Sequence, residues 1–227
     1  MTASVLDIYN GALSAVHAKG AVSSLTEASR EREVCERWYS VVRDVVQEAA
    51  YWPACQATIR LALKQERDST LAWADGNPAP QFLFSYYLPE NYLRARYLPG
   101  YQPFVIEFDH VEGKLMLSTN VESATLVYSR RSDSVVQWSP GQQLATMYGL
   151  ASHIAGPLTG DKQLKALNAK LANDILLSAQ SAVAGGQDFQ IDVMPSIFAA
   201  RGAAGFASET RYTYPVGSLF AGANVDG

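Results

Sequence analysis

Apolar positions near the start of the chain recur with the period of an amphipathic helix. Ser4 and Asp7 have the spacing of a capping box, and the apolar positions after them continue to a stop at Gly20. A second capping box, Ser24 with Glu27, precedes a longer stripe of apolar residues at helical spacing. The members of this stripe are Val34, Trp38, Val41, Val42, Val45 and Ala49. We predict two helices here that bury their apolar faces in one core.

The pair Trp52-Pro53 interrupts the second of these helices. Because proline is favoured in the first turn of a helix, Pro53 suggests that another helix starts here. Apolar positions from Ile59 to Leu63 fit its continuation. The segment 75–80, Asp-Gly-Asn-Pro-Ala-Pro, ends it and is the clearest internal break. We therefore predict a third helix between Pro53 and this loop.

The pattern changes after residue 80. Residues 81–101 are rich in aromatic residues and interrupted by prolines, so a regular helix is not expected there. Apolar residues then alternate with polar ones from Phe104 to Phe108, a turn follows at 112–114, and a third apolar run extends from Ala124 to Tyr128. This alternation predicts a three-stranded antiparallel meander, inserted at about residues 103–131.

Two more helices are predicted before residue 186. Ser139-Pro140 combines an N-cap with a first-turn proline, and that helix is expected to end at Gly156-Pro157. Asp161 caps the last long helix, which ends at Gly185-Gly186. The predicted fold class is therefore mainly α with a small antiparallel β insertion: a helical bundle domain over residues 1–185 and an extended C-terminal arm over 186–227.

The C-terminal segment differs from the rest of the chain in composition. Residues 187–227 hold no lysine and few charges, are rich in Gly and Ala, and show little sustained period. Such a segment cannot bury its own aromatic side chains, so we expect an arm that orders against another surface. The alternative is a strand and loop folded back on the same domain. The candidate partner-binding residues are Phe189, Phe198, Phe206, Tyr212, Tyr214 and Phe220.

Composition narrows the classes of partner. The chain has 227 residues, of which 48% are hydrophobic, which excludes disorder of the whole chain. Its 18 Lys and Arg against 22 Asp and Glu give a formal net charge of −4. The chain therefore has no excess of positive charge with which to bind nucleic acid. Without an apolar run of membrane-spanning length or a signal-like start, we expect a soluble protein made in a cytoplasm, with no membrane partner. Cys35 and Cys55 are expected to be buried thiols.

Catalytic patterns are weak in this sequence. His17, His110 and His153 stand apart from other metal ligands, so neither a metal site nor a cofactor is expected. No nucleophile elbow occurs, and a small hydrolase using serine and histidine is a minor alternative. Glu107 and Asp109 share one side of a strand, where a catalytic pair is conceivable but a solvated sheet face is the simpler interpretation. We therefore predict that the protein is not an enzyme.

An arginine cluster is interleaved with tyrosines. It contains Arg94, Arg96 and Arg130-Arg131. Such a combination can stack on and neutralise a nucleic-acid backbone, but it is also enriched at protein interfaces. The acidic total favours the protein interface.

Short motifs along the chain follow a recognisable order. They are Asn10–Leu13, Ser24–Ser29, Cys35, Tyr39, Arg43-Asp44, Trp52-Pro53-Ala54, Tyr87–Arg94, the Phe104–Phe108 strand, the Gly113 turn, the Ala124–Arg130 strand with Tyr128, and Leu144–Leu150. This series, over residues 5–183, resembles the tail tubular protein A family, the head-to-tail adaptors of short-tailed bacteriophages. The sequence departs from the family pattern at Asn91, where an acidic residue is expected.

The resemblance implies a structural role in the virion, at the head–tail junction. Adaptors of this family form a ring of twelve copies below the portal protein, and their C-terminal arms dock into that portal. Their opposite face meets the distal tail tube or nozzle protein, and DNA passes through the lumen without sequence-specific binding. The resemblance also implies that there is no catalysis. The alternative is another neck component, a stopper or tail-completion protein, that docks below an adaptor.

Overall fold

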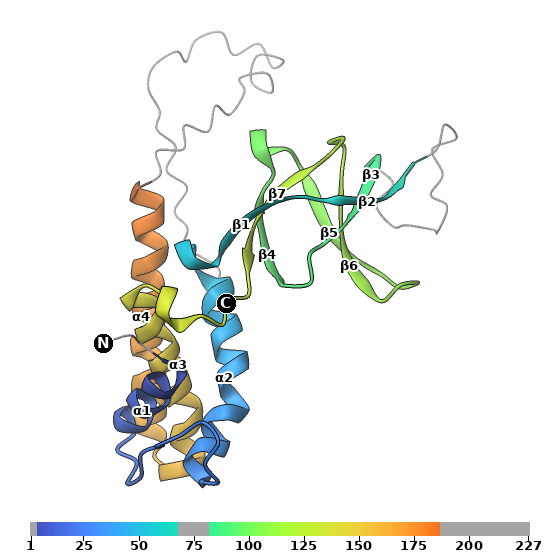
Figure 1. Ribbon diagram of the computed structural model, residues 1–227. Coiled ribbons are helices and arrows are strands. Elements are labelled where there is room, and N and C mark those ends of the chain that lie inside the picture. Colours follow the sequence, from blue (N-terminus) through green and yellow to red (C-terminus); the bar gives the residue numbers. More distant parts are fainter. Residues whose placement is uncertain (1–3, 68–81, 187–227) are drawn as a thin grey trace, which may run out of the picture. The chain divides into compact units, whose positions relative to one another are not determined.

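The computed structural model describes residues 4–67 and 82–186 (Figure 1). Its α-helices are α1 (Val5–Ala15), α2 (Arg30–Ala49), α3 (Pro140–Thr159) and α4 (Lys162–Gly186). Its strands are β1 (Gln56–Arg60), β2 (Ala62–Glu66), β3 (Phe84–Tyr87), β4 (Tyr92–Tyr97), β5 (Phe104–Asp109), β6 (Lys114–Thr119) and β7 (Thr125–Arg130). The described residues thus form four α-helices and two antiparallel sheets, a mixed α/β fold with more strand than the sequence predicted.

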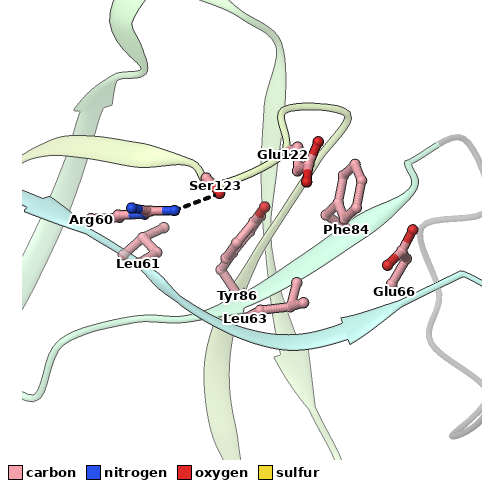
Figure 2. Close-up of a pocket in the computed structure, with 8 residues that line it drawn as sticks. All are labelled: Arg60, Leu61, Leu63, Glu66, Phe84, Tyr86, Glu122 and Ser123. Atoms are coloured by element: carbon pink, nitrogen blue, oxygen red, sulfur yellow. Dashed lines mark hydrogen bonds between the residues drawn. The ribbon is translucent and has the colours of Figure 1, made fainter.

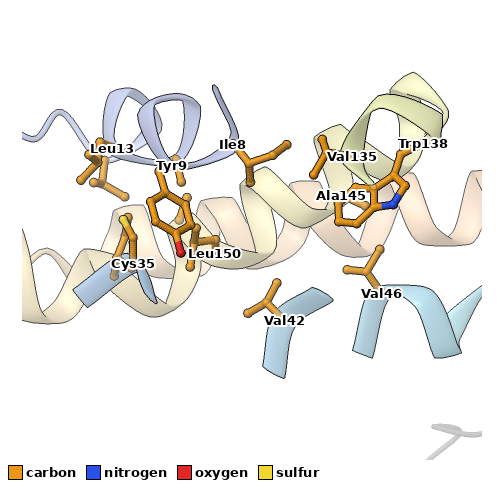
Figure 3. Close-up of a cluster of buried hydrophobic side chains, with 14 of the residues drawn as sticks. Ile8, Tyr9, Leu13, Cys35, Val42, Val46, Val135, Trp138, Ala145 and Leu150 are labelled. Atoms are coloured by element: carbon orange, nitrogen blue, oxygen red, sulfur yellow. The ribbon is translucent and has the colours of Figure 1, made fainter. Parts of the chain in front are cut away.

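The helices form a bundle in which α3 contacts α1, α2 and α4. Buried side chains from α1, α2 and α3 meet in one core, with Leu150 fully buried among them (Figure 3). Gly149 allows α2 to come close, because a Cβ at this position would lie 2.9 Å from Cγ1 of Val42. Arg30 at the start of α2 donates to the carbonyl of Pro157 near the end of α3, at 2.7 Å. Helices α2 and α3 are therefore antiparallel.

The helix ends confirm some predicted boundaries and correct others. The Ser4–Asp7 capping box opens α1, and the Asp161 carboxylate accepts from the backbone of Gln163 at the start of α4. The Ser24–Glu27 box does not open α2. The Glu27 carboxylate instead accepts hydrogen bonds within the preceding turn, from Ser23 and then Ser29, which lower its pKa to about 2, and Ser29 caps the helix. The sequence predicted that α3 ends at 156–157, but the helix continues to Thr159.

The end of α3 lies at Gly160. The helix continues through Pro157 to Thr159, and Gly160 adopts a left-handed backbone with φ of 70°. Pro157 has no N–H to donate to the His153 carbonyl one turn earlier, so the helix passes through it with one backbone hydrogen bond fewer. The left-handed conformation, which glycine adopts without a Cβ penalty, is what ends the helix.

The inserted β module spans residues 56–130, with its internal segment 68–81 outside the described residues, and is larger than the predicted insertion at 103–131. Pro53 does open a helix, but only the one-turn 3-10 helix Pro53–Cys55. The rest of the expected third helix is wrong, because its described part forms β1 and β2. The aromatic segment 81–101 contains β3 and β4. One sheet has the order β1-β7-β4 and the other the order β2-β3-β6-β5. The meander is also wrong, since β7 pairs with β1 and β4 and leaves only the β5–β6 hairpin.

A second core explains why the strands divide in this way. The buried residues of the β module come from both sheets and from the segments between strands, and they include Leu61, Tyr86, Leu98, Leu117 and Leu126. Leu61 lies between β1 and β2, where the chain leaves one sheet for the other. Burial on this shared core, rather than proximity in sequence, selects the partner of β7.

The β module is joined to the bundle at the C-terminal end of α2. The Arg96 guanidinium on β4 donates to the carbonyls of Glu48 and Ala50 at 3.0 and 2.7 Å, which gives partners to carbonyls that end a helix. The fully buried Gln47 amide donates to the Ser132 carbonyl at 2.7 Å and accepts from the Ser132 N–H at 3.0 Å. We call Arg96, Gln47 and Ser132 the α2 junction.

Candidate functional site

The candidate site residues of the C-terminal arm lie outside the described residues. This holds for all six aromatic positions, Phe189, Phe198, Phe206, Tyr212, Tyr214 and Phe220. The surfaces considered below therefore belong to residues 4–67 and 82–186.

The three histidines occupy separate environments. His153 on α3 stacks on Trp38 with ring centroids 4.7 Å apart, and burial lowers its pKa. His110 lies edge-on to Phe108, and His17 lines a groove between helices. Within the described part of the chain, no group of three or more His, Cys, Asp or Glu side chains is placed to hold a metal ion. None of the described helices is long and apolar enough to span a bilayer.

The predicted arginine cluster is divided between different partners. Arg96 belongs to the α2 junction, and Arg131 on the segment after β7 donates to the Asp44 carboxylate at 3.0 Å. Asp44 also pairs with Arg43, which in turn pairs with Asp133. Arg96 and Arg131 thus connect the β module to α2, whereas Arg94 is exposed on β4 and Arg130 is half-buried at the end of β7.

A pocket of about 250 Å³ opens in the β module (Figure 2). Leu61, Leu63 and Phe84 form part of its wall, and Glu66 and Glu122 are exposed carboxylates that line it. Its other polar groups already have partners: Arg60 donates to the Ser123 hydroxyl at 2.7 Å, and the Tyr86 hydroxyl donates to the Val121 carbonyl at 2.7 Å. Among its described lining residues, no nucleophile is hydrogen-bonded to a general base.

The β5–β6 hairpin carries a buried ion pair that the sequence did not predict. Asp109, expected on a solvated face, is buried and pairs with Lys64 on β2, whose side chain is 5% exposed. Asp109 also accepts from the Val111 N–H at 2.9 Å, and Lys64 lies 3.8 Å from Glu112. Glu107 is separately engaged, since it accepts from the Ser118 hydroxyl at 3.1 Å. The two carboxylates therefore serve different structural contacts.

The turn of the hairpin is fixed by the same residues. Gly113 takes a left-handed backbone with φ of 66°, and its N–H donates to the Asp109 carbonyl at 2.8 Å. The Tyr87 hydroxyl donates to Glu112 at 3.0 Å, which ties the turn to β3. The hairpin end is thus held in one conformation by contacts at its base.

This turn presents large apolar side chains to solvent. Val111 is 75% exposed, and Phe108 and Leu115, which are paired across the hairpin, are 47% and 45% exposed. We call Phe108, Val111 and Leu115 the hairpin knob. Exposed apolar side chains mark a protein interface where they form a large contiguous patch. The alternation of apolar and polar residues predicted strand β5, but it did not indicate that the apolar side chains at the end of this strand are exposed to solvent.

A groove of about 380 Å³ lies between α1, α3 and α4. We call its main lining residues the helical groove: Gly11, Met147, Leu164, Leu167, Asn168 and Leu171. Leu167 remains 53% exposed, whereas the Asn168 amide is satisfied by the Leu164 carbonyl at 2.9 Å. Ser14, His17 and Tyr148 also line the groove, so its wall is partly apolar and partly polar.

The ion pair at the hairpin base predicts a pH dependence. The hydrogen bond from Lys64 is the main cause that holds the pKa of Asp109 below its ordinary value. The stabilisation is therefore present above about pH 4 and is lost as the pH falls through the lower folded pKa. We expect Lys64→Met to lower the exchange protection of the Val111 and Gly113 amides by roughly ten-fold, and acid to do the same in the unmodified chain.

Hydrogen exchange followed by NMR measures this effect. Lys114→Met is the matched control, because Lys114 is an exposed lysine on the same hairpin, directly opposite Asp109 in the pairing register. Equal protection in the two variants would contradict the role given to the buried pair.

Comparison with known proteins adds no relative: no protein-family model matches this chain, and no curated protein matches it in sequence.

Proposed function

We propose that this protein is a structural head-to-tail adaptor of a bacteriophage. Copies of the chain form a ring that connects the portal to the distal tail and lines the channel through which DNA passes. The arm at 186–227 docks on the portal through its aromatic residues. The proposal starts from the ordered motif series over residues 5–183 and from the composition of the arm.

The positions of the motif residues support this proposal. Asn10 ties α1 to the following loop through hydrogen bonds with the Val22 N–H and carbonyl at 2.8 and 2.9 Å. The Trp52 indole N–H donates to the Val46 carbonyl at 2.7 Å, and Asp44 holds Arg131. The Asn10 and Trp52 contacts fix the chain around α1 and the end of α2, and the Asp44 contact joins α2 to the segment after β7. The motif residues thus have structural roles at these places, and this is the observation that carries the proposal.

Asn91, where the family pattern has an acid, also has a defined role. Its side-chain oxygen accepts from the Tyr128 hydroxyl at 3.1 Å, and its carbonyl accepts from the Arg131 N–H at 2.8 Å. An amide oxygen accepts a hydroxyl proton as a carboxylate does. Asn91 thus makes a hydrogen bond between the loop before β4 and strand β7, and its neutral amide carries no charge for an ion pair.

The solution mass tests the proposal. Light scattering of the 24.7 kDa chain is expected to give a monomer when the protein is alone. Mixing with the portal ring of the same virus is expected to add about twelve copies, the number set by a portal of twelve-fold symmetry. If no salt condition gives association, the adaptor assignment is wrong, and binding below an adaptor would then identify a stopper or tail-completion protein.

A further inference from the structure

The pocket in the β module combines apolar side chains with two carboxylates (Figure 2). Its apolar lining residues are Leu61, Leu63, Phe84 and Tyr86. The ring centroids of Phe84 and Tyr86 lie 6.4 Å apart, and Leu63 remains 51% exposed. The carboxylates belong to Glu66 and Glu122, both of which are exposed. The pocket therefore offers an aromatic and aliphatic surface together with negative charge that solvent can reach.

A bulge in β2 brings Glu66 to this pocket. In the register of β2 and β3, Leu63 pairs with Tyr86. Glu66 pairs with Phe84, so a step of three residues on β2 matches a step of two on β3. Because side chains alternate between the two faces of a strand, Glu66 would lie on the face opposite to Leu63 without the extra residue. The bulge thus places a carboxylate on the same face as Leu63 and the Phe84 ring.

The charge of the pocket is not balanced by its own residues. The charged side chains that line it are Arg60, Glu66 and Glu122, and one arginine against two glutamates leaves a net charge of −1. Arg60 donates to the Ser123 hydroxyl at 2.7 Å, and the ion pairs among the described residues involve neither glutamate. The neighbouring cations Lys64 and Arg67 are not among the described lining residues, and Lys64 is already paired with Asp109. Two carboxylates are therefore available to a cation from outside.

Shape and charge together favour an arginine side chain as the occupant. The pocket volume of about 250 Å³ lies below the range of about 300–1,000 Å³ that is usual for free small ligands, so it suits one long side chain of a larger partner. The planar guanidinium of arginine stacks on aromatic rings and donates to two carboxylates at once, whereas the ammonium of lysine is compact and more strongly hydrated. The aliphatic stem of arginine covers apolar surface such as that of Leu63.

We propose that the pocket in the β module binds an arginine side chain of a partner protein. The guanidinium stacks on the Phe84 ring and donates to the carboxylates of Glu66 and Glu122, while the stem packs on Leu63. Arg60 stays on the Ser123 hydroxyl and does not compete for the carboxylates. This inference goes beyond the adaptor function, because the site lies within the β module and needs neither a ring nor a portal.

An NMR titration of the full-length chain with N-acetyl-arginine amide tests the site. We expect shifts centred on the Leu63 methyl groups and the Phe84 ring. N-acetyl-citrulline amide has nearly the same shape without the charge, and it should bind roughly ten-fold more weakly, because the ring contact and both ion pairs are lost. N-acetyl-lysine amide should bind about three-fold more weakly than the arginine probe. Equal binding of the three probes, or shifts centred on residues outside the pocket, would overturn the proposal.

Conversion of the carboxylates to amides measures their contribution. We expect Glu66→Gln and Glu122→Gln each to weaken binding of the arginine probe about three-fold, and the double variant to weaken it about ten-fold. Glu90→Gln is the matched control, because Glu90 is an exposed glutamate that is not among the described lining residues and its replacement changes the net charge equally. If Glu90→Gln weakens binding as much, the attraction comes from the net charge of the chain and the site is refuted.

A peptide probe distinguishes a protein partner from a free guanidinium compound. The N-acetyl-Leu-Arg-Leu amide should bind about three-fold more tightly than N-acetyl-arginine amide, since its flanking side chains cover further apolar surface around the exposed Leu63. Binding no tighter than that of the single amide would contradict a protein as the source of the arginine.

Light scattering separates the remaining outcomes. A chain that is monomeric when alone supports a different protein as the partner. A dimer that dissociates in the Glu66→Gln, Glu122→Gln double variant would show that another copy supplies the arginine, which overturns that assignment. The double variant is expected to bind a portal ring normally, because the portal is engaged by the arm. Absence of portal binding in the unmodified chain would therefore contradict the adaptor function and leave the arginine site standing.

Discussion

Deleting residues 187–227 will abolish binding to a portal ring while residues 4–186 stay folded. The members of both described cores lie before residue 180, so the deletion removes none of them. The removed segment holds six aromatic residues, a class that dominates interface energetics. Replacement of a single anchor of this kind by Ala costs about 1–3 kcal/mol of binding, so loss of all of them is expected to leave no measurable complex.

Circular dichroism and sedimentation with the portal measure the two parts of this prediction. The helical signal should be kept and the complex lost. A full-length chain in which all six aromatics are replaced by Ala controls for arm length, and it should fail to bind in the same way. Normal docking of the truncated chain would show that the portal contact lies within residues 1–186.

Replacing Gln47 by Leu will lower the free energy of unfolding by about 2–6 kcal/mol, since two buried groups lose their partner and each costs about 1–3 kcal/mol. The buried amide is the hydrogen-bond partner of both the N–H and the carbonyl of buried Ser132. Leucine fills similar space but offers neither a donor nor an acceptor. Both backbone groups of Ser132 would then stay buried without these partners.

Urea unfolding gives this free energy. Gln137→Leu is the matched control, because that glutamine is exposed and its replacement should change stability by less than about 0.5 kcal/mol. Similar losses in both variants would show that the effect arises from glutamine replacement in general and not from the α2 junction.

The helices were predictable because their signals are local. The capping box at Ser4, the cap at Asp161 and the apolar period between them lie within a few residues of the helices they define. The strands between residues 56 and 66 were missed because Pro53 suggested a helix start. The alternation at Ile59, Leu61 and Leu63 is too short to distinguish a strand from a helix by itself.

The pairing of the strands and the exposed apolar faces depend on distant residues. Strand β7 pairs with β1, about seventy positions earlier, and no local period encodes that choice. The predicted stripe of α2 included Val41 and Val45, which are exposed, because a helix pattern does not state how many neighbours cover it. Asp109 is buried against Lys64 because β2 and β5 belong to the same sheet, and the local sequence does not show that relation.

The way in which the β module is inserted determines how it would bear a mechanical load. The chain enters the module after α2 and returns before α3, so two covalent connections lead back to the bundle. Tension on the module is divided between these connections, and the Arg96 and Gln47 hydrogen bonds resist rotation of the module about them. A pull on the β module therefore reaches α2 and α3 together, and neither helix has to bear it alone.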